Sequence, residues 1–254
     1  MKKLIALTIV LTIAAASVPA EAGLGIKVKG GYSWISYGDY NDWVEKANKD
    51  MPQGLPAYEE LHWIPEISAE FMFPLFPTIS GAVGVGYLSG KVDYNVSIGA
   101  DGLSSVHKVK SIPILLNVYW EPPLEVINPF VYGGVGFYRT GLEFDLSITS
   151  GGNVDGYNAE LDKWGFGLQA GGGVSIALAP TVSFDVGIQG RWADISGFEG
   201  TATSVDGEKE EVYLGKGVVE GYDVYGPVAV DSGLEEASVG LSGYTIFIGL
   251  TVGF

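Results

Sequence analysis

The last twelve residues of the chain, "GYTIFIGLTVGF" (243–254), alternate between two sets of side chains. Because successive side chains of a β-strand point to opposite faces, this stretch predicts a strand with one wholly apolar face and one small or polar face. That pattern is typical of a sheet with an apolar medium outside and a crowded or wet interior, whereas a soluble sandwich usually carries charge on its polar face. The apolar face comprises Tyr244, Ile246, Ile248, Leu250, Val252 and Phe254, and the other face Thr245, Phe247, Gly249, Thr251 and Gly253.

The chain begins "MKKLIALTIVLTIAAASVPAEAG", in which two lysines precede an apolar run and an Ala-Glu-Ala site. This layout predicts a secretory signal peptide over residues 1–22 and an exported domain over residues 23–254. An N-terminal membrane anchor is the alternative, but the run is shorter than the ~20 apolar residues that a spanning helix needs.

The composition narrows the classes of protein and partner. Cysteine is absent, so disulfides and thiolate metal sites are excluded, and we expect no cofactor. The net charge of −16 argues against a nucleic-acid partner, which would require clustered lysine and arginine. No later stretch is apolar for long enough to form a spanning helix, so a membrane-embedded form of this chain must be a closed barrel.

Eight segments of the chain alternate in this way. In the first three, charge is confined to one face, and in the fifth the assignment of faces is ambiguous. The connections between segments alternate too: "PLFP", "EPPLEVINP" and "AP" are short, and the others are about 24, 15, 19 and 47 residues long, which is typical of periplasmic turns and extracellular loops. The sequence therefore predicts an all-β fold, an eight-stranded antiparallel up-and-down transmembrane β-barrel, with a soluble calycin-like barrel as the alternative. The segments are 23–37, 62–73, 78–90, 106–120, 130–144, 164–178, 182–192 and 243–254.

Pro65 and Pro113 count against this scheme, because proline removes a ladder hydrogen bond and a barrel has no free edge. Local bulges are the explanation we expect.

The stretches "SIPILLNVYW", "NPFVYGGVGFY" and "WGFGLQAGGGVSIALAPTVSFDVGIQGRW", followed by a closing strand that ends in Phe254, resemble the OmpA-like, OmpW-like and opacity-type group of small outer-membrane β-barrel proteins. The resemblance covers about residues 23–254. It implies location in the outer membrane of a double-membraned bacterium, among lipids and lipopolysaccharide. In that group a terminal aromatic after alternating apolar residues is read by the barrel-insertion machinery, which implies this role for Ile248, Leu250, Val252 and Phe254.

The predicted lumen carries a polar cluster of Lys27, Lys29, Glu66, Glu70, Asp185, Gln189 and Arg191. We expect the two lysines to lie near the two glutamates, since they occupy neighbouring segments. Buried charges must be paired, so the cluster is either a structural plug or the lining of a narrow conduit. Segments 78–90 and 164–178 contribute mostly glycine, alanine and serine, which leaves room for a small solute.

The sequence gives little support for an enzyme. The enzymes of this architecture resemble lipid A deacylases and acyltransferases, and the deacylases need a serine, a histidine and an acid presented to lipid. The chain has only His62 and His107, both near the predicted extracellular rim, and Ser105 shares the inward face of His107. We therefore predict no catalytic site and no metal site.

Acidic residues are concentrated in 194–240, which is predicted to be an extracellular loop that repels anions or binds a cation or a cationic partner. Lys108 and Lys110 face outward near the same end, where they could contact lipopolysaccharide phosphates. The first loop contains "NDWVEKANKDM", a predicted short helix that is capped by Asn41 or Asp42 and covers the barrel mouth. The function predicted from these features is a scaffold that presents acidic loops, and the alternative is a narrow OmpW-like channel for small or hydrophobic solutes.

Overall fold

The computed structural model describes residues 23–99, 101–122, 124, 127–219 and 221–254. The predicted signal peptide, residues 1–22, lies outside them.

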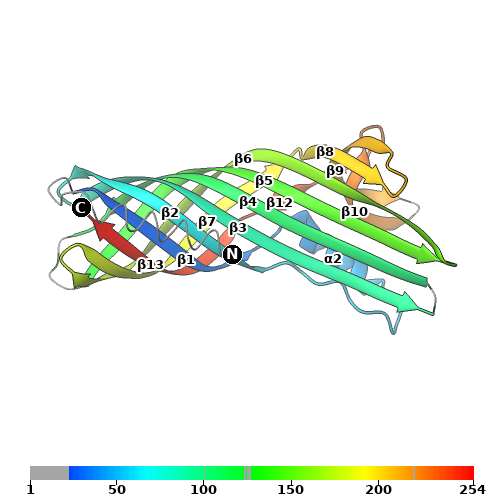
Figure 1. Ribbon diagram of the computed structural model, residues 1–254, viewed down its shortest axis with the longest axis horizontal. Helices are drawn as coiled ribbons and strands as arrows, with labels where there is room; N and C mark the ends of the chain where they lie inside the picture. The colour runs from blue at the N-terminus through cyan, green and yellow to red at the C-terminus, as the bar shows by residue number, and fades with distance from the viewer. Residues whose placement is uncertain (1–22, 100, 123, 125–126, 220) are drawn as a thin grey trace.

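Eight strands close into a ring (Figure 1). Each pairs with the next in antiparallel fashion, and the last strand pairs with both its predecessor and the first. The predicted eight-stranded up-and-down barrel is therefore confirmed. The strands are β1 (Gly25–Ile35), β2 (Trp63–Phe76), β3 (Ile79–Ile98), β4 (Asp101–Trp120), β5 (Ile127–Ser150), β6 (Asn153–Ala179), β7 (Val182–Ser196) and β13 (Gly243–Gly253).

The two ends of the barrel differ. At one end, which we call the turn end, β2–β3, β4–β5 and β6–β7 are joined by short connections, and the carboxyl terminus lies there (Figure 1). We call the other end the extended end, because β3 to β6 continue there far beyond β1 and β2. The predicted loops after segments 78–90 and 130–144 are wrong, because these residues continue the strands. β5 and β6 are joined through Gly151 and Gly152, whose φ angles of 57° and 88° suit a two-residue hairpin turn.

The sequence pattern did not predict these extensions, because their apolar side chains face inward and their polar side chains face outward. Within the membrane-spanning part, apolar side chains point out and polar ones point in. In the extensions, Val92 and Tyr94 of β3 are buried inside, whereas Lys91 and Asp93, which alternate with them, are exposed. Apolar residues face inward wherever water surrounds the sheet, so the inversion marks where the barrel leaves the membrane.

Residues 194–240 also fold, contrary to the prediction of a surface loop. β8 (Glu199–Ser204) pairs with the outer part of β6, β9 (Lys209–Val219) with β8, and β10 (Tyr222–Ala229) with β9. Two short strands, β11 (Glu235–Glu236) and β12 (Ser238–Gly240), pair with β9 and β7. The buried side chains of this segment, which include Val212, Leu214 and Val239, join the core of the extended end. Burial of these residues explains why an acidic segment does not remain a solvated loop.

The helix predicted in the first connection is present as α2 (Asp39–Lys49), but the predicted cap is wrong. Gly38 occupies the cap position, with φ of 54° and no side-chain capping bond. The Asn41 side chain instead bonds Ser36 O at 2.7 Å and Leu61 N at 3.0 Å, which ties the two ends of the connection together. Tyr40 and Val44 are buried at the mouth of the barrel, so the helix covers the mouth as expected. Among the described residues, no helix is long and apolar enough to cross a membrane.

The two prolines do not interrupt the ring. β2 pairs with β3 only from Glu66 onward, so Pro65 stands where a donor toward β3 is no longer needed. The β3–β4 pairing is interrupted beside Pro113, where a Cβ on Gly86 would lie 2.8 Å from the proline ring. Glycine at position 86 therefore makes room for that ring. The expected bulge is absent at Pro65, where the pairing with β1 continues without a shift of register.

Candidate functional site

The residues predicted to form the lumen cluster are all placed in the barrel interior. Their side chains are nearly inaccessible to solvent, and the most exposed of them, that of Glu66, is 8% exposed. The members are Lys27, Lys29, Glu66, Glu70, Asp185, Gln189 and Arg191.

The cluster divides into two groups, and the pairing differs from the expected one. Near the turn end, Lys29 pairs with Glu70, whose other oxygen accepts a hydrogen bond of 2.5 Å from Tyr119. Lys27 lies between Asp185 at 3.7 Å and Glu121 at 3.5 Å. Neither lysine pairs with Glu66. Each buried ammonium nevertheless has a carboxylate partner, as low-dielectric surroundings require.

Aromatic rings surround the two lysines. Lys27 Nζ lies 4.3 Å from the ring centroid of Phe130, and Lys29 Nζ lies 4.9 Å from that of Tyr132 and 5.4 Å from that of Phe247. These separations suit cation–π attraction. Phe247 departs from the small or polar face predicted for β13, and its ring helps to close the interior near the turn end.

The second group lies at mid-barrel and centres on one carboxylate oxygen. Glu66 Oε2 on β2 accepts hydrogen bonds from Ser33 Oγ of β1 at 2.5 Å, Arg191 Nη2 of β7 at 2.8 Å and Thr245 Oγ1 of β13 at 3.0 Å. We call Ser33, Glu66, Arg191 and Thr245 the seam cluster, because they join the four strands on either side of the barrel closure. Charge-assisted hydrogen bonds of this kind are the strong ones, so the seam cluster fixes the closure.

The room left by glycine in β6 is occupied. A Cβ on Gly171 would lie 2.7 Å from the ring of Tyr132, and one on Gly167 would lie 2.9 Å from the ring of Tyr138. Gln169 between them bonds Asn117 at 2.7 Å. A void beside the seam cluster measures only about 10 Å³, which is about the smallest volume that can hold one water molecule. The interior at this level is filled by side chains from facing strands.

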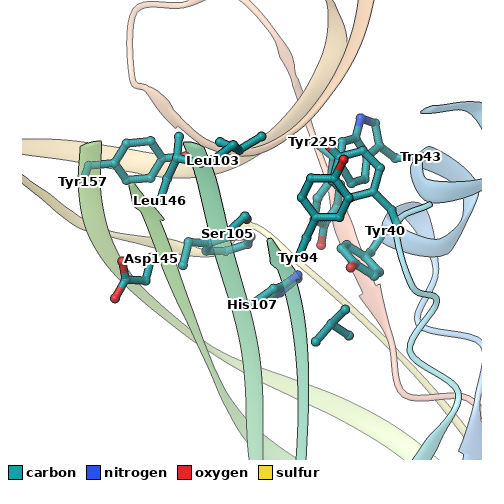
Figure 2. Close-up of a pocket in the computed structure, with 13 residues that line it drawn as sticks. Tyr40, Trp43, Tyr94, Leu103, Ser105, His107, Asp145, Leu146, Tyr157 and Tyr225 are labelled. Carbon is teal, nitrogen blue, oxygen red and sulfur yellow. The ribbon is translucent and has the colours of Figure 1, made fainter. Parts of the chain in front are cut away.

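Above this level the mouth contains a larger, partly open cavity of about 200 Å³, which is lined by residues of α2, β3, β4, β5, β6 and β10 (Figure 2). His107 lies at its floor, where Tyr37 Oη is 3.0 Å from Nε2 and the ring of Phe144 stacks at 4.2 Å. Burial lowers the pKa of His107 to about 3, so this imidazole is neutral at ordinary pH. Ser105 lines the same cavity, but no hydrogen bond joins it to His107 in the described part of the chain. His62 lies elsewhere, between Glu60 and Asn41.

Lys108 and Lys110 lie on the outer face of β4, above the apolar surface. Both pair with Glu143 of β5, Lys108 at 3.2 Å, and both are partly exposed. Arg139 and Asp162 form a further pair nearby, with 3.7 Å between their charged atoms. The lysines are therefore available to an outside partner only in competition with Glu143.

The exterior of the ring between these charges and the turn end is continuously apolar. Side chains such as Val85, Leu116 and Ile188 are 45–55% exposed although nothing polar accompanies them on that face. At the upper edge Trp63 and Tyr244 lie together, with ring centroids 5.9 Å apart, and Trp120 stands at the turn end of β4. A closed ring, an apolar band and aromatic residues at its edges are the requirements for strands that span lipid. The chain has the architecture of a small outer-membrane β-barrel.

Solved structures of outer-membrane proteins show a similar arrangement at low sequence identity. Neisserial surface protein A matches with 14% identity over 92% of this chain and 98% of its own, with a TM-score of 0.42. A major outer membrane protein from Thermus thermophilus matches with 13% identity over 91% and 99%, with a TM-score of 0.48. OprG from Pseudomonas aeruginosa matches with 14% identity over 92% and 96%, with a TM-score of 0.42. Comparison with protein-family models and with curated protein sequences gives no match.

The proposed assembly residues of the barrel form the outer face of β13. Ile248 and Leu250 are about half exposed, as expected for lipid-facing side chains, but Phe254 is only 8% exposed. Its backbone completes the closure, because Phe254 N donates to Leu24 O at 2.8 Å and Leu24 N donates to Phe254 O at 3.2 Å. The terminal aromatic thus belongs to the β1–β13 seam.

Several interior residues were missed by the sequence reasoning. Glu121 lies in a predicted turn, Tyr119 and Tyr132 were not assigned to the lumen, and Ser33 and Thr245 were not included in the predicted cluster. The signal that could have identified the tyrosines is alternation. Tyr119 has the same inward parity as Asn117, and Tyr132, which is opposite Tyr119, has the same parity as Gly134, which is opposite Asn117.

Proposed function

We propose that this barrel is a non-conducting scaffold that holds a folded, acidic domain at the cell surface. The observation that carries the proposal is the filled interior. From the seam cluster to the turn end, paired charges and aromatic rings from the described residues occupy the interior, and the void beside the seam cluster holds no more than about one water molecule. An eight-stranded barrel has an interior that side chains can just fill, so blockage is the ordinary outcome for this size.

The extended end supports the second half of the proposal. Long extensions belong to the extracellular side of such barrels, and here the extensions of β3 to β6 carry β8, β9 and β10 beyond the membrane band. The exposed acids include Glu208, Glu210 and Glu211 on one edge and Glu235 and Glu236 on β11. A surface with this many exposed carboxylates attracts positive charge, and we infer that its partner is a cationic macromolecule. Lipopolysaccharide phosphates at Lys108 and Lys110 remain part of the proposal.

The narrow OmpW-like channel has less support, because the side chains of Tyr138 and Arg191, which project into the barrel interior, are buried. Channel recording in planar bilayers distinguishes the two functions. We expect no conductance steps from heat-modifiable, folded protein, and no swelling of liposomes in a small sugar. The variant Tyr119→Gly with Phe130→Gly removes two blocking rings near the turn end and serves as the positive control for a detectable leak. Steady conductance by the unmodified barrel would overturn the scaffold proposal.

A further inference from the structure

The cavity at the mouth has no role in a scaffold, yet its lining is specialised. Aromatic side chains converge on it from six elements: Tyr40 and Trp43 of α2, Tyr94 of β3, His107 of β4, Phe144 of β5, Tyr157 of β6 and Tyr225 of β10 (Figure 2). Tyr58 completes the lining and stacks on Tyr94, with centroids 4.1 Å apart. A volume of about 200 Å³ exceeds that of engineered apolar cavities of about 150 Å³ that bind benzene. The cavity is therefore large enough for a small organic molecule.

The rings are held in place by contacts outside the cavity. Trp43 Nε1 donates to Asp223 O at 2.9 Å, and Tyr40 Oη donates to Glu59 O at 3.2 Å. The Tyr40 ring meets those of His107 and Tyr225 edge-on, with centroids 4.7 Å and 5.6 Å apart. Rings fixed in this way present a preorganised surface, which reduces the entropy lost when a ligand binds.

Two polar atoms in this lining lack partners. His107 Nδ1 and Tyr225 Oη are buried, and neither has a hydrogen-bond partner among the described residues. Buried polar groups are almost always paired, so these two atoms are candidate partners for a polar group of a bound ligand. A single hydroxyl group can donate to one and accept from the other.

The charge of the lining is equally selective. No lysine or arginine lines the cavity in the described part of the chain, and His107 is neutral. The one charged lining residue is Asp145, whose carboxylate points away from the rings in Figure 2. The whole chain carries a net charge of −16, which attracts cations and repels anions. Aromatic faces without competing positive charge are the preferred environment of a methylated ammonium group.

We propose that the aromatic mouth cavity binds a small organic cation, a quaternary ammonium that carries one hydroxyl group. The ammonium group lies against the rings of Trp43, Tyr58 and Tyr94, and the hydroxyl group bonds His107 Nδ1 and Tyr225 Oη. The site does not depend on whether the barrel conducts, since the filled level lies below it.

The test is titration calorimetry with the folded barrel in octyl glucoside, a detergent without an ammonium group. The probes are choline, its uncharged carbon isostere 3,3-dimethyl-1-butanol, and tetramethylammonium, which lacks the hydroxyl group. We expect one choline per barrel, at least tenfold weaker binding of the isostere, and intermediate binding of tetramethylammonium. Equal binding of choline and the isostere would overturn the cation site and leave an apolar pocket. Failure of a folded preparation to bind choline would also overturn it.

Variants of the lining residues test which side chains contact the ammonium group of the ligand and which contact its hydroxyl group. Trp43→Leu should weaken both cations at least tenfold, whereas Tyr222→Leu, which removes a ring that is 75% exposed and lies outside the cavity, should change neither. Tyr225→Phe keeps the ring and removes the unpaired hydroxyl, so it should weaken choline to the level of tetramethylammonium and leave tetramethylammonium unchanged. A loss of both cations in Tyr225→Phe would contradict the assignment of the hydroxyl contact.

Discussion

Replacement of Glu66 by leucine should destabilise the barrel more than removal of any surface charge. The Arg191 side chain is 2% exposed, and Glu66 is its only salt-bridge partner among the described residues. Glu66→Leu removes the three hydrogen bonds to Oε2 and leaves the guanidinium buried without a counter-charge. Breaking a buried pair by removing one partner costs about 3–5 kcal/mol. We therefore expect the free energy of unfolding to fall by that amount.

A double-mutant cycle gives the sharper result. Arg191→Met alone should cost a similar amount, because it strands the carboxylate, but the combination of both replacements should cost much less than the two single costs added together. An apolar pair of similar volume often replaces a buried ion pair with little loss, so a coupling of at least about 3 kcal/mol is expected.

The assay is urea unfolding in lipid vesicles, followed by tryptophan fluorescence and by the shift of the folded band on unboiled gels. Glu143→Gln is the matched control, because that carboxylate pairs with Lys108 and Lys110 on the outer face at 30% exposure, where a pair contributes about 0–1 kcal/mol. If Glu66→Leu costs no more than Glu143→Gln, or if the single costs simply add, the seam cluster does not hold the closure.

Three further predictions concern other parts of the barrel. Deletion of Phe254 should reduce the amount of folded protein recovered from outer membranes without reducing export, whereas Phe254→Tyr should leave that amount unchanged. Equal recovery of the unmodified protein, the deletion and Phe254→Tyr would contradict a role of Phe254 in assembly. His107 has a folded-state pKa of about 3 against a usual 6.5, so the unfolded chain binds the extra proton first, and stability should fall by up to about 1.4 kcal/mol per unit as pH drops from 6.5 toward 3. His107→Phe should flatten that dependence, and an unchanged slope in melts between pH 7 and 4 would assign the acid sensitivity to other groups. Replacing both Lys108 and Lys110 by alanine should reduce lipopolysaccharide retained on purification, whereas Lys46→Ala on α2 should not; equal retention would exclude the contact.

Alternation in the sequence was sufficient to predict the ring, because lipid outside and a packed interior inside impose opposite demands on successive residues. It identified the inward side chains of the lumen cluster, such as Lys27 and Arg191, but not their partners. An ion pair depends on how far a long side chain reaches across the lumen. Lys27 illustrates this: its backbone is paired with Glu70, yet its ammonium lies between Asp185 and Glu121.

The extended end could not be predicted by the same rule. Water surrounds the strands there, so Val92, Tyr94 and Leu142 face inward, and a search for outward apolar residues reads such stretches as loops. The mouth cavity was missed for a further reason, because its rings come from segments as distant as α2 and β10, and no local pattern indicates that Tyr40 and Tyr225 meet.

The hairpin that joins β5 and β6 has a consequence for engineering. From Phe137, at the upper edge of the apolar band, to Ser150, β5 rises about 34 Å, since a strand advances about 3.4 Å per residue and barrel strands tilt by roughly 40°. Gly151 and Gly152 stand at the tip of this rise, both exposed, and a Cβ on either would meet no atom within 4 Å. Exposed tips with such small residues tolerate added chain. A peptide epitope inserted between these glycines would be displayed on a rigid stalk, well clear of the lipid headgroups and accessible to antibodies on intact cells.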